Sequence, residues 1–101
     1  MGLRAMIVIE IKTRLIEIGK EIDHLLQTIE QMDVEHKALL MPRVNELQSR
    51  HKDLEADHDL LRLFDESEWG GFSKQLEMEL HKLSHDVGTV QAMTEQEMVP
   101  A

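Results

Sequence analysis

The sequence predicts an all-α protein with a single helical domain over residues 1–101. The chain of 101 residues has room for one hydrophobic core. Its apolar residues recur at alternating steps of three and four, the spacing of an amphipathic helix. Aromatic residues make up only 3% of the chain and tyrosine is absent, which disfavours a β-sandwich.

The first forty residues carry the longest apolar stripe and predict an amphipathic helix over residues 5–41. The stripe occupies the a and d positions of more than three heptads. Ile16, Leu26 and Leu40 fall beside it and widen the apolar face, so this helix is expected to pack against at least two others. The stripe consists of Val8, Ile11, Leu15, Ile18, Ile22, Leu25, Ile29 and Met32, and the same spacing continues to His36 and Leu39, over four to five heptads in all.

Pro42 interrupts this pattern, and a second stripe predicts helix over residues 43–66. Pro42 either begins a new helix at its first position or kinks one continuous helix. The residues around it include no Gly, Asn, Asp or Ser, which favours the bent continuation over a tight reversal. The second stripe consists of Val44, Leu47, His51, Leu54, His58 and Leu61.

The pair Gly70-Gly71 predicts a turn, followed by an antiparallel helix over residues 72–87 and a tail over residues 89–101. Trp69, with Phe64 and Phe72 nearby, is expected to pack at this corner.

Two architectures remain open. In the first, a helical hairpin with one long arm leaves the stripe from Val8 to Met32 exposed, and soluble monomers avoid such a patch. The hairpin would therefore form an oligomeric bundle, most simply a symmetric dimer, with that stripe as the interface. In the second, the chain also reverses at Pro42 and forms a three-helix bundle.

The charge and composition exclude several classes of protein. Twenty acidic residues stand against 11 Lys and Arg, for a net charge of −9, which disfavours direct binding to nucleic acid. The chain has no cysteine, so disulfides, thiolate zinc sites and cysteine nucleophiles are excluded. No apolar run is long enough for a signal peptide or a membrane span, and a cytoplasmic protein is expected.

Histidine and glutamate spacings suggest a divalent-metal site. His81 and His85 are four residues apart, so both rings can reach one ion from the same helix face. Glu55 and His58 have the Glu-x-x-His spacing of carboxylate-bridged metal bundles. The alternative is that His81 and His85 only face solvent, opposite the core.

Three histidines occupy a positions of the heptad pattern: His36, His51 and His58. A polar residue in such a seam commonly fixes the register of the packed helices. The other hypotheses for these positions are metal sharing, a pH switch, or simple tolerance at a partly exposed seam.

No catalytic motif is present, so an enzyme is not expected. The leading hypothesis is a small acidic protein that self-associates and serves as a protein-interaction or scaffold module. The first alternative is a metal-binding bundle. The second is an acidic mimic of nucleic acid that occupies a basic protein through the carboxylates between Asp53 and Glu68.

Overall fold

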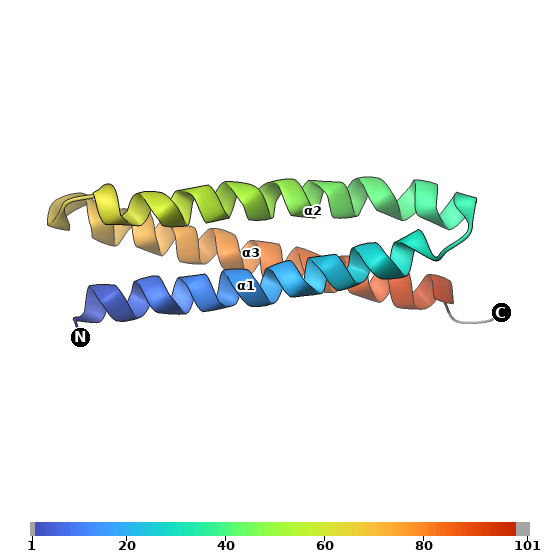
Figure 1. Ribbon diagram of the computed structural model, residues 1–101, viewed down its shortest axis with the longest axis horizontal. Helices are drawn as coiled ribbons and strands as arrows, with labels where there is room; N and C mark the ends of the chain where they lie inside the picture. The colour runs from blue at the N-terminus through green and yellow to red at the C-terminus, as the bar shows by residue number, and fades with distance from the viewer. Residues whose placement is uncertain (1, 99–101) are drawn as a thin grey trace.

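The computed structural model, which describes residues 2–98, is a three-helix bundle in which the second helix runs antiparallel to the first and the third (Figure 1). Helix α1 spans Leu3–Glu30, α2 spans Val34–Leu60, a short 3-10 turn η1 spans Leu61–Leu63, and α3 spans Glu66–Met98. The bundle measures 55 × 19 × 17 Å. Residues 2–98 contain no strand, and the predicted all-α class is confirmed.

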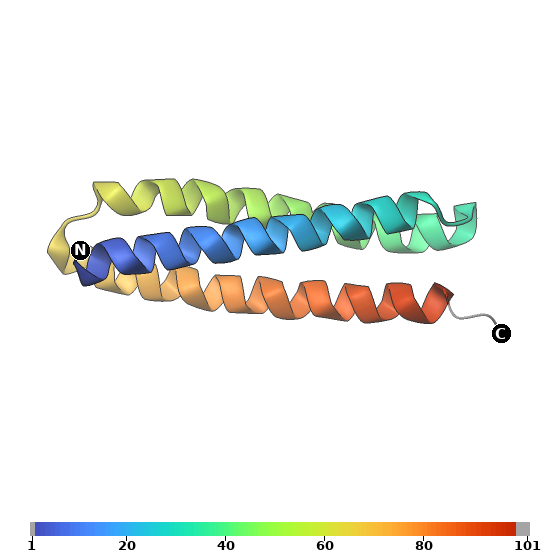
Figure 2. The same cartoon turned by 60° about the horizontal axis from the view of Figure 1, so that its bottom comes forward.

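Each helix turns one apolar stripe toward the bundle axis, and the three stripes form a continuous core. Figures 1 and 2 show α2 and α3 running along the length of α1. The buried apolar side chains are Ile11, Leu15, Ile18, Ile22, Leu25 and Ile29 in α1; Leu40, Val44, Leu47 and Leu54 in α2; Leu61 in η1; and Trp69, Leu76, Leu80, Leu83, Val87 and Val90 in α3.

The stripe from Val8 to Met32 was predicted to be an oligomer interface because a helical hairpin would leave it exposed. In the bundle, the stripe is covered within a single chain. Six of its eight members are at most 5% exposed within the single chain. Val8 and Met32, at its ends, are partly buried and pack against the same core. The stripe is covered because α2 and α3 both contact α1, so it is not the exposed patch that the hairpin architecture requires.

The first reversal lies at residues 31–33 and not at Pro42. Asp33 caps α2, and its side chain accepts a hydrogen bond from the backbone N–H of His36 at 2.9 Å. Helix α2 continues through Pro42. Pro42 cannot donate to the carbonyl of Ala38, but both residues are exposed, so water can hydrate that carbonyl.

The second reversal lies at residues 61–65 and not at Gly70-Gly71. The Asp65 carboxylate accepts hydrogen bonds from the backbone N–H groups of Ser67 and Glu68, each at 3.1 Å, and thereby caps α3. Both glycines lie inside α3, where a glycine costs only about 1 kcal/mol relative to alanine. The packing of a long helix outweighs that cost.

The residues expected to form a C-terminal tail are helical as far as Met98, because Val90 and Thr94 are buried against the bundle. Gly88 therefore does not end the helix. Residues 99–101 of the expected tail lie outside the described residues. Within residues 2–98, no helix is both long and apolar enough to cross a membrane.

Candidate functional site

Two histidines of α2 bond to the backbone of α1 in a repeated arrangement. The Nε2 atom of His51 lies 2.7 Å from the carbonyl oxygen of Leu15, and that of His58 lies 3.0 Å from the carbonyl oxygen of Val8. A carbonyl oxygen only accepts, so Nε2 carries the proton in both rings. A step of seven residues in α2 thus matches a step of seven in the antiparallel α1, which fixes the register of the two helices.

Gly19 provides the space for the His51 ring. A Cβ at Gly19 would lie 3.1 Å from both Cε1 and Nε2 of His51, closer than most contacts of this kind. On its other side, the Nδ1 atom of His51 lies 3.2 Å from a carboxylate oxygen of Glu55. The ring is therefore held between α1 and a residue of its own helix.

His36 connects the start of α2 to the end of α3. Its Nδ1 lies 2.8 Å from the Asp33 carboxylate, and its Nε2 lies 2.7 Å from the Glu97 carboxylate. Both ring nitrogens face acceptors, which suits the doubly protonated imidazolium. The hydrogen bond to Asp33, with the negative charge of Glu97 as a smaller cause, raises the pKa of His36. The backbone N–H of His36, with its ring as a smaller cause, lowers the pKa of Asp33 by donating hydrogen bonds to that carboxylate.

All three histidines at a positions therefore bond to another helix. This geometry supports the hypothesis that they fix register.

The four residues proposed as metal ligands are not brought together. Glu55 contacts His51, while His58 points at α1, where its Nδ1 is buried without a hydrogen-bond partner. His81 and His85 are exposed on α3. Among residues 2–98, no group of three or more His, Cys, Asp or Glu side chains is placed to hold a metal ion. The exposed His81/His85 pair is what remains of the predicted site.

Arg4 closes the end of the bundle near η1, a role that the sequence reasoning missed. Its guanidinium donates to the carbonyl oxygens of Leu61 at 3.1 Å and Phe64 at 2.7 Å. It also lies 5.1 Å from the centre of the Trp69 ring, within the range of a cation–π interaction. Phe64 stacks on Phe72 with ring centres 4.4 Å apart, so these aromatic rings pack beside the reversal at residues 61–65 and not at a turn formed by Gly70-Gly71.

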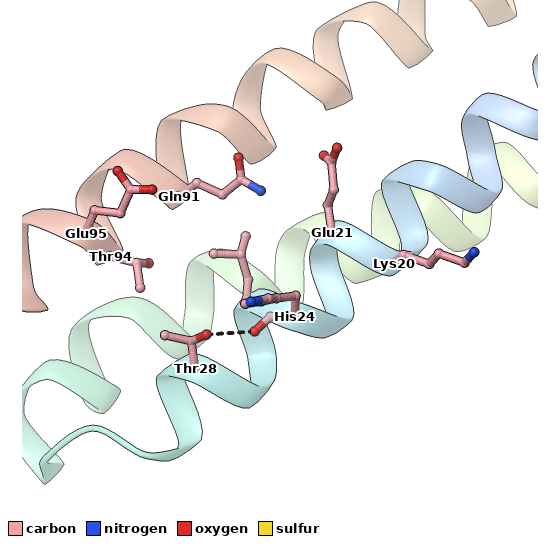
Figure 3. Close-up of a pocket in the computed structure, with 8 residues that line it drawn as sticks. Lys20, Glu21, His24, Thr28, Gln91, Thr94 and Glu95 are labelled. Atoms are coloured by element: carbon pink, nitrogen blue, oxygen red, sulfur yellow. Dashed lines mark hydrogen bonds between the residues drawn. The ribbon is translucent and has the colours of Figure 1, made fainter.

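A cleft of about 550 Å³ lies between α1 and α3 (Figure 3). Leu25 and Thr94 are its buried members. Its exposed rim carries both signs of charge, so it does not select a simple anion or cation. The cleft is lined by Lys20, Glu21, His24, Leu25, Thr28, Gln91, Thr94 and Glu95.

The outward surface of α1 carries a second heptad stripe, which we call the outer α1 stripe: Met6, Ile9, Thr13 and Ile16. These residues follow one another at steps of three, four and three. Met6 is 57% exposed, Ile9 52% and Ile16 48%, and Leu3 next to them is also exposed. The sequence reasoning counted Ile16 as an extension of the core face and missed the other three.

The outward faces of the other helices differ from this stripe. Exposed positions of α2 include Ser49, Lys52, Asp53 and Ala56, and those of α3 include Lys74, Met78, His81 and His85. These residues are mostly polar or small, as expected for solvated helix faces. Large apolar side chains are also exposed at Val34, Leu39 and Leu60 of α2 and at Leu63 of η1, whereas the first half of α1 groups Met6, Ile9 and Ile16 on one helix face.

Comparison of the chain with protein families, with curated proteins and with solved structures finds no match.

Proposed function

We propose that the chain is a small acidic interaction module that self-associates, and that the outer α1 stripe is its contact surface. The observation that carries this proposal is the exposure of Met6, Ile9 and Ile16 at heptad spacing on one helix face. These side chains are about half exposed and belong neither to the core nor to the partly buried residues packed against it. Apolar side chains at such positions favour contact with another molecule over contact with water.

The core stripe of α1 cannot serve this purpose without opening the bundle, so association must use a separate surface. The outer α1 stripe spans only about three helical turns, so we expect its contact to be small beside the roughly 1,200 Å² of a standard protein complex. We therefore expect weak, concentration-dependent association. A contact of this strength suits an interaction module that assembles reversibly.

Sedimentation velocity over a wide range of protein concentrations tests this function. We expect the wild-type mass to rise above 11.7 kDa with concentration. Ile9→Glu should keep the chain monomeric, because it places a carboxylate in the contact. Met78→Glu is the matched control, since Met78 is 56% exposed but lies on α3. A wild-type chain that stays monomeric at every concentration would refute the proposal.

The exposed pair His81 and His85 supports a second candidate function, which is binding of a divalent transition metal. Four-residue spacing on a helix lets both imidazoles reach one ion, and the remaining ligands would be water or a second copy. Calorimetric titration with Zn²⁺ tests it in untagged protein. The expected heat of binding should disappear in His81→Ala, and wild-type protein that gives no heat would exclude the site.

A further inference from the structure

We infer that the outer α1 stripe pairs with the same stripe of a second copy in parallel orientation, as a short two-stranded coiled coil. The inference rests on the proposed self-association and adds the partner, the register and the direction. In a heptad assigned to this stripe, Met6 and Thr13 occupy a positions, and Ile9 and Ile16 occupy d positions. The a and d residues of two copies would then face each other across the pair.

The charges beside the stripe complement one another between copies. Lys12 occupies a g position on one side, and Glu10 and Glu17 occupy e positions on the other. All three are exposed, and within the described part of the chain none of them forms an ion pair. In a parallel coiled coil, a g residue lies beside the e residue five positions later in the partner helix. Lys12 of each copy would therefore lie beside Glu17 of the other.

The same charges oppose antiparallel pairing. In that orientation, g positions face g positions and e positions face e positions. The side of the stripe that carries Lys12 would then meet the same side of the partner, and the side that carries Glu10 and Glu17 would meet the partner's glutamates. Both arrangements bring like charges together. The charge pattern thus selects one direction, which is how e and g residues set the orientation of coiled coils.

The apolar contact ends at a defined position, and a second copy can reach it. The next a and d positions of the stripe are Lys20 and Asp23, so the apolar contact ends after Ile16. Helices α2 and α3 both contact α1, and Met6, Ile9 and Ile16 remain about half exposed beside these contacts. Two bundles can therefore lie side by side with their α1 helices in contact.

Charge reversal tests the direction of the pair. Lys12→Glu or Glu17→Lys alone would place like charges at both symmetric contacts of a parallel dimer. We expect the dissociation constant measured by sedimentation at low salt to rise about tenfold for either variant. An equimolar mixture of the two variants should recover wild-type affinity, because every like pair then becomes an opposite pair. An antiparallel pair, in which like sides already meet, would lose affinity with neither reversal, and Glu17→Lys would strengthen it by placing a lysine on the glutamate side of its partner.

A cysteine cross-link tests the register. The chain has no cysteine, so Thr13→Cys introduces a single thiol at an a position that faces its own copy in the parallel pair. Mild oxidation should give mainly disulfide-linked dimer. Ser49→Cys, on the exposed surface of α2, is the matched control and should remain largely monomeric.

Two results would overturn the parallel pair. One is that Thr13→Cys cross-links no better than Ser49→Cys. The other is that neither charge reversal lowers the affinity while Ile9→Glu still abolishes association. Either result leaves self-association through the outer α1 stripe in place, whereas a wild-type chain that is monomeric at all concentrations removes both proposals.

Discussion

Replacing a helical glycine by alanine should change the stability of the protein in opposite directions at Gly19 and Gly88. A Cβ at Gly19 would lie 3.1 Å from the ring of His51, whereas a Cβ at Gly88 meets nothing within 4 Å. In an open helical position, alanine stabilises the fold by about 1 kcal/mol relative to glycine. Gly88→Ala should show this gain, and Gly19→Ala should not.

The magnitude at Gly19 follows from the atom that the new methyl group would touch. That atom, Nε2 of His51, lies 2.7 Å from the carbonyl oxygen of Leu15. Displacing the ring weakens a hydrogen bond worth about 0.5–1.5 kcal/mol, and crowding a packed site costs roughly another 1 kcal/mol. Together these two costs exceed the stabilisation that alanine provides relative to glycine in a helix. We expect Gly19→Ala to destabilise the protein by about 1 kcal/mol, which makes a difference of about 2 kcal/mol from Gly88→Ala.

Urea unfolding followed by circular dichroism measures this difference. The His51→Ala background supplies the control, because without the ring Gly19→Ala should stabilise the protein as Gly88→Ala does. The register role of His51 would be refuted if Gly19→Ala stabilised the wild-type chain as much as Gly88→Ala. It would also be refuted if the effect of Gly19→Ala were unchanged in the His51→Ala background.

Three further predictions concern the ends of the helices. Arg4→Met removes both hydrogen bonds to the carbonyl oxygens at the η1 end and should lower the free energy of unfolding in urea by about 1–3 kcal/mol; an unchanged value would contradict the closing role of Arg4. Asp65→Ala removes the cap of α3 and should cost about 1 kcal/mol in the same assay, with Asp65→Asn retaining most of the stability. The pKa of His36 is raised above its ordinary 6.5, so its contact with Asp33 and Glu97 contributes stability below pH 6.5, and that contribution is lost as the pH rises through the higher folded-state pKa. The melting temperature of wild type should therefore fall more between pH 6 and pH 8 than that of His36→Gln, and parallel pH profiles would count against this contact.

The helical class could be predicted because burial in a helix repeats every three or four residues. The first turn could not be predicted in the same way. Ile29, Met32 and His36 keep the heptad spacing across residues 31–33, so the stripe runs through the reversal without a break. Asp33, a good helix cap, was the signal that could have located it.

The glycine pair was misleading for an energetic reason, whereas the favoured expectation at Pro42 was a helix that continues past it. Pro42 is exposed, where water can replace its missing hydrogen bond, and Gly70 and Gly71 each cost only about 1 kcal/mol inside a long packed helix. The sequence prediction relied on the local tendency of paired glycines to end helices, and the packing of a long helix outweighs that tendency.

The candidate sites depended on which way each helix faces. Glu55 and His58 have the right spacing for a metal site, but the direction of α2 turns His58 toward the backbone of α1. Ile16 was predicted to widen the core face of α1, but it is 48% exposed and is not packed against the core. The side of a helix that packs against its neighbours is set by the tertiary arrangement, and the spacing of Glu55 and His58 alone does not reveal it.

A dilution series of ¹H–¹⁵N correlation spectra tests most directly whether the outer α1 stripe is the contact surface. We expect concentration-dependent shifts to cluster on Met6, Ile9, Thr13 and Ile16, while the amides of the buried core stay constant. Shifts that cluster on the exposed face of α3 around Met78, or spectra that do not change with concentration, would contradict this account.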